Sequence, residues 1–180
     1  MEGDDIHPCD DSQGKESSLG LRQSFLVPLG GGWTVAKIEA TTSIECPAAE
    51  VWRFVTDFPR APEYDPNIIS VRQTSDGPLA VGTNFELTDR KVGKGTFRTI
   101  EYDPGRKVTW VVTSPRPMEG SKHGIILEDI EGKSKLTITW DLKLGGFYRL
   151  VGPYVVHSMR KATGAQASGI KRILESEAPH

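Results

Sequence analysis

Seven segments of the chain alternate hydrophobic and polar residues with a period of two, the pattern of a half-buried β-strand. They cover residues 36–46, 68–75, 83–90, 95–103, 106–114, 122–131 and 135–144. The last segment shows the pattern well, because one of its faces would carry Leu136, Ile138, Trp140 and Leu142. Short connections between the last six segments predict antiparallel hairpins in a sheet with one hydrophobic face.

Two helical patterns accompany these segments. Pro47 opens the first, because proline is favoured in the first turn of a helix, and the prolines that follow allow a short helix and turns. Residues 147–177 carry a second pattern, with side chains at steps of three or four. Its core-facing positions are Phe147, Val151, Val155, Met159, Ala162, Gln166, Ile170 and Ile173. We therefore predict an α+β fold: a curved antiparallel sheet of about seven strands wrapped around a long C-terminal helix, with two short helices after the first strand.

The middle of the long helix has little bulk. From Ala162 to Gly169 the chain offers Ala, Thr, Gly, Ala, Gln, Ala, Ser and Gly. Such residues could leave room for a ligand beneath the helix, or could let the helix approach the sheet closely. The length of the run favours a cavity, since each glycine inside a helix costs about 1 kcal/mol of helix propensity.

The N-terminal region differs from the rest in charge and pattern. Residues 1–32 hold six acidic and two basic residues, a net charge of −4, so the remaining residues carry +2 of the total of −2. We predict a disordered acidic tail and linker over residues 1–32 and one domain over residues 33–177. Within this region, "SFLVPLGGGW" could form an extra edge strand or a flap over a hydrophobic opening. The chain shows no clustered basic patch, so we expect no nucleic-acid partner.

The two cysteines and the apolar content bear on the compartment. We expect Cys9 and Cys46 to be free thiols, which suits a reducing compartment. The N-terminus lacks the pattern of a secretory signal, and no apolar run approaches the ~20 residues of a membrane-spanning helix. We therefore expect a cytoplasmic protein with no integral membrane segment.

Several stretches resemble a known superfamily. "ECPAAEVWRFVTDFPRAPEYDPNIISVRQTSDGPLAVGTNFEL" resembles the start of polyketide cyclase/dehydrase-type proteins in the START-like, Bet v 1-like (SRPBCC) superfamily. The shared pattern is a strand, a Pro-x-x-x-Val-Trp helix and a proline-bounded segment that ends in Tyr64-Asp65-Pro66. Later strands, "VGTNFEL", "TIEYDPGRKVTW" and "KSKLTITWDL", also match, and the likeness covers residues 36–176. The family often has Trp where this chain has Tyr64.

The resemblance implies a helix-grip domain with a ligand cavity between sheet and helix. Members include cyclases, lipid carriers, hormone receptors, coenzyme Q-binding proteins and a chaperone activator, so the resemblance implies no single activity. The family has no universal catalytic motif, and no catalytic residue is carried over from it.

Candidate site residues fall into two groups. For a ligand-binding wall we select Phe85, Phe97, Trp110, Trp140, Met159, Ala162 and Gln166. For acid–base chemistry we select Tyr64, Glu101, His123, Tyr154 and His157.

Three of these assignments have plainer alternatives. Trp110 and Trp140 could each pack in an ordinary core, and His157 could lie on a solvated flank of the last helix. If Phe97 faces inward, Arg98 faces solvent, and strict alternation brings Thr99 and Glu101 inward.

Two functions are compatible with these residues. The first is a protein that binds a hydrophobic small molecule, a lipid or a polyketide-like compound, without changing it. The alternative is a cofactor-independent cyclase or dehydratase that uses cavity acid–base residues; a protein-interaction module is a weaker alternative. Neither His123 nor His157 has a metal-ligand partner at a suitable spacing, so we expect no metal and no cofactor. The residues give no indication of an oligomeric state. Convergence of the acid–base candidates in one pocket would favour the enzyme.

Overall fold

The computed structural model describes residues 20–22, 26–29, 33–145 and 150–176. Seven strands form the body of an antiparallel sheet, and each corresponds to one of the seven alternating segments. They are β3 (Trp33–Ile44), β4 (Ile68–Gln73), β5 (Asn84–Asp89), β6 (Gly93–Asp103), β7 (Lys107–Ser114), β8 (Lys122–Ile130) and β9 (Lys133–Leu144). Their order across the sheet is β3-β9-β8-β7-β6-β5-β4. Each of the five hairpins from β4 to β9 joins strands that are adjacent in space, as their short connections predicted.

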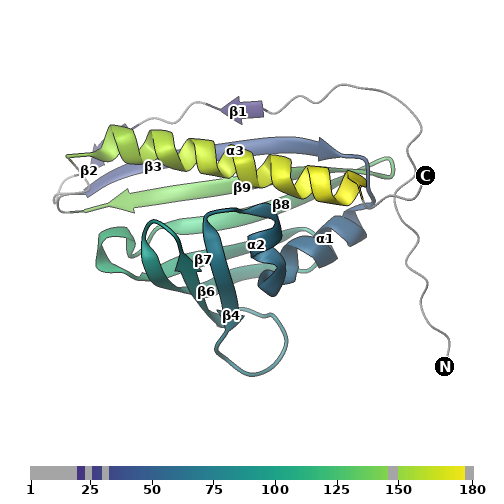
Figure 1. Ribbon diagram of the computed structural model, residues 1–180, viewed down its shortest axis with the longest axis horizontal. Coiled ribbons are helices and arrows are strands. Elements are labelled where there is room, and N and C mark those ends of the chain that lie inside the picture. Colours follow the sequence, from purple (N-terminus) through teal and green to yellow (C-terminus); the bar gives the residue numbers. More distant parts are fainter. Residues whose placement is uncertain (1–19, 23–25, 30–32, 146–149, 177–180) are drawn as a thin grey trace.

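The helices occupy one side of this sheet. They are α1 (Ala48–Thr56), the 3₁₀ turn η1 (Phe58–Arg60), α2 (Ala61–Tyr64), a second 3₁₀ turn η2 (Arg116–Met118) and α3 (Gly152–Ser176). Figure 1 shows α3 running along β3 and β9, while α1 and α2 cover the sheet near the end of α3. The α+β helix-grip architecture is therefore confirmed. The predicted start of the long helix, at Phe147, lies outside the described residues.

Two further strands lie at the N-terminal edge of the sheet. β1 (Gly20–Arg22) and β2 (Leu26–Leu29) both pair antiparallel with β3. The stretch "SFLVPLGGGW" was open to two interpretations, an extra edge strand or a flap. Residues 26–29 of this stretch form an edge strand. These two strands fall inside the region expected to be a disordered tail and linker. Residues 1–19, 23–25 and 30–32 lie outside the described residues, and the domain boundary at residue 33 stays a prediction.

The buried hydrophobic side chains form two separate clusters. The larger one lies under α1 and α2 and includes Trp52, Phe85 and Trp110. The smaller one joins Ala36, Leu142 and Leu144 to Val156 near the start of α3. Trp52 is a core residue that contacts Tyr102, with ring centroids 6.1 Å apart. The space between sheet and α3 is thus not filled by one continuous core.

Cys46 corrects one sequence-based expectation. This residue is fully buried, and it is disulfide-bonded. The prediction of a free thiol is therefore wrong for Cys46, and with it falls the argument from free thiols to a reducing compartment. Cys9 lies outside the described residues.

Among the described residues, no helix combines the length and the apolar character that a bilayer crossing requires.

A candidate ligand cavity between the sheet and the last helix

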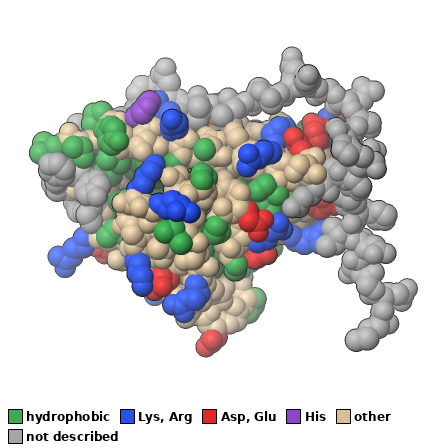
Figure 2. Space-filling view, in the orientation of Figure 1, with side chains coloured by type: hydrophobic (Ala, Val, Ile, Leu, Met, Phe, Trp, Pro, Cys, Tyr) green, Lys and Arg blue, Asp and Glu red, His purple; other side chains and the backbone are tan. Residues whose placement is uncertain are grey.

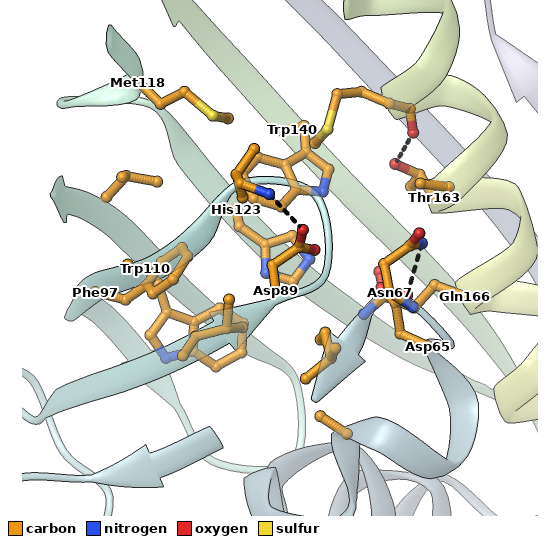
Figure 3. Close-up of a pocket in the computed structure, with 18 of the residues that line it drawn as sticks. Asp65, Asn67, Asp89, Phe97, Trp110, Met118, His123, Trp140, Thr163 and Gln166 are labelled. Atoms are coloured by element: carbon orange, nitrogen blue, oxygen red, sulfur yellow. Dashed lines mark hydrogen bonds between the residues drawn. The ribbon is translucent and has the colours of Figure 1, made fainter. Parts of the chain in front are cut away.

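A cavity of about 470 Å³ separates the concave face of the sheet from α3. This volume lies within the range of small-molecule pockets. Its walls come from α1, η1 and α2 on one side, from β4 to β9 across the floor, and from Tyr154 to Gln166 of α3 on the other (Figure 3). Most of the lining side chains are hydrophobic or aromatic, so the cavity suits an apolar ligand.

A continuous belt of rings forms part of the wall. Phe58 contacts Phe85 and Trp110 edge-on, with ring centroids 4.6 and 5.0 Å apart. The ring of His123 lies 5.3 Å from that of Trp110 and 4.5 Å from that of Trp140. The order follows from strand register, because His123 on β8 is directly opposite Trp110 on β7 and Trp140 on β9. Cross-strand neighbours share a sheet face, so the belt faces the cavity as a unit.

His123 is a polar group set into this apolar belt. Its Nε2 atom is sealed from solvent and has no hydrogen-bond partner among the described residues. Burial lowers the pKa of the imidazole to about 4, so the ring is neutral at pH 7. A neutral imidazole has one N–H group that can donate a proton and one nitrogen that can accept a proton. Its neutral form is the one compatible with an apolar wall.

All seven predicted ligand-wall residues line the cavity: Phe85, Phe97, Trp110, Trp140, Met159, Ala162 and Gln166. Three of the five acid–base candidates line it as well: Tyr64, His123 and Tyr154. Their roles stay predictions, but the structure brings these ten side chains to one space.

Glu101 is not in the cavity. Thr99 on β6 is opposite Trp110, and the next paired residue, Glu101, is opposite Thr109, so Ile100 forms a β-bulge. The extra residue reverses the alternation, and Glu101 turns to the outer face. There its carboxylate accepts hydrogen bonds from Lys107 and Thr109, at 2.9 and 3.1 Å. The bond from Lys107 lowers the pKa of Glu101. The predicted inward orientation of Glu101 is therefore wrong.

The residue before the bulge follows the expected alternation. Phe97 lines the cavity, while Arg98 is exposed and its Nε donates to the Asn84 side-chain oxygen at 3.1 Å. Thr99 is fully buried. Alternation therefore predicts the orientation correctly up to the bulge at Ile100 and fails at Glu101.

His157 also lies outside the cavity. It is exposed on α3, which agrees with the solvated-flank interpretation and contradicts its selection as a cavity acid–base group. Tyr154, one turn earlier, is 75% exposed but still contributes to the lining. Together with Val92 of the β5–β6 turn, which is 51% exposed, Tyr154 marks the mouth of the cavity. Figure 2 shows hydrophobic, Lys and Arg side chains mixed on this face below α3.

Tyr64 is the last residue of α2 and lines the cavity. Its side chain is 4% exposed, and its ring contacts Phe54 with centroids 5.5 Å apart. Burial, reinforced by the charge of Asp65, raises the pKa of the phenol above its usual value. The hydroxyl therefore stays protonated, and it can donate a hydrogen bond but is a poor base at neutral pH.

The small residues of α3 have three different environments. Ala162 lines the cavity, together with Thr163 and Gln166. Ala165 is exposed. Gly169 allows close packing, because a Cβ atom there would collide with the backbone carbonyl oxygen of Tyr64. The cavity interpretation therefore agrees with the position of Ala162, whereas the close approach at Gly169 is to the backbone of α2 and not to the sheet.

The sequence did not identify the polar residues at the end of the cavity nearest α2. Asp65 and Asn67 line it, and Asp65 Oδ1 accepts hydrogen bonds from the Asn67 backbone N–H and side-chain amide at 2.9 and 3.0 Å. Figure 3 shows these residues and Gln166 together, on the opposite side of the view from Phe97 and Trp110. The Asp-Pro step before a strand was a usable signal, since Asp and Asn favour such turns.

The described residues contain no cluster of three or more His, Cys, Asp or Glu side chains that could hold a metal ion. The charged groups of the lining are Asp65, Asp89 and Lys91. Asp89 accepts hydrogen bonds from the backbone N–H groups of Lys91 and Val92, at 2.7 and 3.0 Å, and so shapes the turn beside the mouth.

Comparison with solved structures places the architecture among known folds. The chain is similar to the di-domain aromatase/cyclase BexL of the BE-7585A biosynthetic pathway, with a TM-score of 0.63 and 17% identity, over 77% of this chain and 46% of that one. It is also similar to Ara h 8.0201, with a TM-score of 0.61 and 18% identity, over 79% and 99% of the two chains. A third match is TTHA0849 from Thermus thermophilus, with a TM-score of 0.66 and 13% identity, over 79% and 99%. The chain thus spans about half the length of the di-domain protein, and these identities establish the fold alone.

Sequence comparisons give the family. No curated protein matches the chain. Residues 35–175 match the model of the family described as polyketide cyclase / dehydrase and lipid transport, and this range covers most of the chain. The seven-stranded sheet, the long helix and the cavity between them agree with that match, and the chain belongs to the polyketide cyclase / dehydrase and lipid transport family.

Proposed function

We propose that this protein binds a hydrophobic small molecule in the cavity between the sheet and α3 and releases it unchanged. The observation that carries the proposal is the cavity itself, about 470 Å³ with a largely hydrophobic wall. Native interiors are close-packed, so a space of this size with an aromatic belt is costly unless something fills it. The family description, with its reference to lipid transport, supports the same class of ligand.

The arrangement of polar groups supports binding over catalysis. Tyr64 and His123 line the cavity, whereas Glu101 and His157 do not. Within the described part of the chain, no hydrogen bond links any two of these four candidates. General acid–base catalysis requires a group within hydrogen-bond reach of the reacting atom and an environment that tunes its pKa. Tyr64 keeps its phenol proton and the His123 imidazole is neutral, so both are suited to orient a ligand by hydrogen bonds.

A cyclase or dehydratase is the second candidate, and one observation favours it. His123 is neutral at pH 7 in a closed, aromatic environment, and so it could take a proton from a bound polyketide-like substrate. Substitution of His123 by Phe would abolish such turnover and would leave simple binding of apolar ligands largely intact. A product formed by the wild-type protein and not by His123→Phe would establish the enzyme.

Native mass spectrometry of the protein purified from its own source tests the binding function. We expect a bound apolar molecule. Ala162→Phe, which fills the cavity, should remove it, while Ala165→Phe on the exposed side of the same helix should retain it. Equal occupancy in both variants, or no bound molecule in the wild type and no uptake of added apolar ligands, would contradict the proposal.

A further inference from the structure

The end of the cavity between α2 and α3 holds two polar side chains that the protein itself leaves unpaired. Tyr64 is 4% exposed and Gln166 is 7% exposed, and both line the cavity. Neither the Tyr64 hydroxyl nor the Gln166 amide hydrogen-bonds to another side chain or backbone group in the described part of the chain. Among the described residues, the side-chain polar atoms that are sealed from solvent and have no partner belong to Thr99, His123 and Arg160. The polar atoms of Tyr64 and Gln166 are not sealed in this way. Their polar atoms therefore remain accessible from the cavity.

These two side chains belong to one small region. Gly169 lets α3 approach the backbone of Tyr64 closely, and Gln166 lies on the same face of α3 one turn earlier. Figure 3 shows Gln166 beside Asn67 and Asp65, the residues that directly follow α2. The aromatic belt from Phe58 to Trp140 provides the apolar wall elsewhere. The cavity thus has an apolar body, charged residues beside its mouth and a polar end between α2 and α3.

The charges of the lining restrict what this polar end can accept. Two carboxylates, Asp65 and Asp89, line the cavity against one cation, Lys91 at the mouth. Arg90 lies close to this end, because its Nε donates to the Pro66 carbonyl oxygen at 2.9 Å, but it is not among the lining residues. An anionic head group at the α2–α3 end would therefore meet Asp65 without a cation of the lining beside it, and desolvation of an unpaired charge is costly. The amide and the phenol can each donate and accept a hydrogen bond. A hydroxyl has the same two capacities and no charge.

We propose that the α2–α3 end of the cavity is a recognition site for an uncharged hydroxyl group on an otherwise apolar ligand, held by the Tyr64 hydroxyl and the Gln166 amide. The proposal deepens the binding function and rests on it. It makes Tyr64 and Gln166 the residues that determine specificity. An apolar ligand without a hydroxyl still fits the aromatic belt, but it leaves two buried polar groups unpaired.

A matched set of probes tests this: biphenyl, 4-hydroxybiphenyl and biphenyl-4-carboxylate. Binding to the full chain at pH 7 is measured by calorimetry and by the fluorescence of Trp110 and Trp140, which line the cavity. We expect 4-hydroxybiphenyl to bind about three- to tenfold more tightly than biphenyl, the usual worth of one or two neutral hydrogen bonds. Biphenyl-4-carboxylate should bind most weakly of the three.

The variants Tyr64→Phe and Gln166→Met remove the polar atoms and keep the size of the side chains. Each should reduce the preference for 4-hydroxybiphenyl over biphenyl by at least half, without weakening biphenyl itself. Gln166→Asn should restore part of the preference, which a merely structural role of Gln166 would not produce. Ser158→Ala, a polar lining residue nearer the mouth, is the matched control and should leave the preference unchanged.

The outcomes separate this inference from the binding function. If the three probes bind equally, or if the preference survives in both Tyr64→Phe and Gln166→Met, the hydroxyl site is wrong and the binding function stands. If His123→Phe alone abolishes the preference, the head group lies at the aromatic belt and the proposal is overturned. If none of the probes binds, the binding function and the inference both fail. Should Tyr64→Phe not fold, Gln166→Met and Gln166→Asn decide the result.

Discussion

The two halves of α3 use small residues for different purposes. In residues 152–166 Val156 packs in the smaller hydrophobic cluster, while Met159, Ala162 and Gln166 border open space and form one wall of the cavity. In residues 167–176 the inward side chains fill space, and Ile170 and Leu174 belong to the main hydrophobic cluster. A helix that is lean along its whole middle therefore carries a binding wall and a packing joint in succession. Small residues in a sequence indicate close approach or empty volume, and tertiary context decides which.

The largest expected loss of stability is at Gly169, in the packed half of α3. A leucine at position 169 would collide with the backbone carbonyl of Tyr64, which cannot move aside as a flexible side chain could. We expect Gly169→Leu to lower the free energy of unfolding by more than about 3 kcal/mol. Ala165→Leu, on an exposed position four residues earlier, should change it by less than about 0.5 kcal/mol. Urea denaturation followed by circular dichroism measures both, and similar values for the two variants would contradict this account of α3.

The cavity bordered by residues 152–166 of α3 should make the stability of the protein sensitive to acid, because His123 lines the opposite wall. Its neighbours across the sheet are Trp110 and Trp140, and burial lowers its pKa to about 4. The unfolded chain binds this proton near pH 6.5 and the folded chain only near pH 4, so stability falls as pH falls between these values. The loss attributable to His123 is roughly 3 kcal/mol, from 1.36 kcal/mol for each unit of pKa difference.

Urea titrations at pH 7, 5.5 and 4.5 measure this loss. The carboxylates also titrate in this range, so the informative quantity is the difference between the wild type and His123→Phe. We expect the variant to lose markedly less stability than the wild type on acidification. Parallel losses in the two proteins would show that the imidazole is not buried in its neutral form.

Ligand occupancy should protect the two halves of α3 unequally. A bound molecule contacts the wall formed by residues 154–166, whereas residues 167–176 are already packed against the core. With 4-hydroxybiphenyl at saturation, we expect amide hydrogen exchange to slow several-fold in the first half and to change little in the second. Hydrogen exchange with mass spectrometry resolves the two segments. Uniform protection along α3 would indicate global stabilisation without a contact specific to the cavity half.

Much of this site could be predicted from sequence because strand and helix periods fix faces. The alternation in β9 predicts Trp140 on the hydrophobic face, and the spacing in α3 predicts Met159, Ala162 and Gln166 on the core-facing side; all four line the cavity. These assignments depend on local geometry alone. They succeed wherever an element keeps its period, as β8 and β9 do from end to end.

The errors have equally physical causes. Glu101 was placed in the cavity because a β-bulge at Ile100 leaves no clear mark in the sequence, yet one extra residue reverses every side chain beyond it. The sequence does not predict the polar end of the cavity near α2, because Asn67 lies in a turn, where no strand or helix period indicates which way a side chain points. The free-thiol prediction for Cys46 fails because disulfide formation depends on tertiary structure, which a local pattern does not contain. In each case the missing information is a long-range contact or an irregular backbone.

The smallest expected change in stability comes from the hydrogen bonds that join residues 167–176 of α3 to the end of β3. Lys171 Nζ donates to the Ser43 carbonyl oxygen and to Glu175 Oε1, each at 2.7 Å, and the same carboxylate oxygen accepts the Glu45 backbone N–H at 3.1 Å. The Lys171 and Glu175 side chains are only 21% and 28% exposed, so solvent screens this network less than a surface ion pair.

We expect Lys171→Met to lower the free energy of unfolding by about 1 kcal/mol, because it leaves Glu175 and the Ser43 carbonyl with unmet hydrogen-bonding capacity. Lys161→Met in the cavity half is the matched control, since Lys161 is exposed and forms no ion pair with another described residue; its effect should stay below about 0.5 kcal/mol. Urea denaturation at 0.1 and 1 M NaCl distinguishes the two, because a partly buried network keeps most of its contribution at high salt. If Lys171→Met costs no more than Lys161→Met, then the second half of α3 is held by its apolar side chains alone, and the contrast between the two halves rests on packing without help from charge.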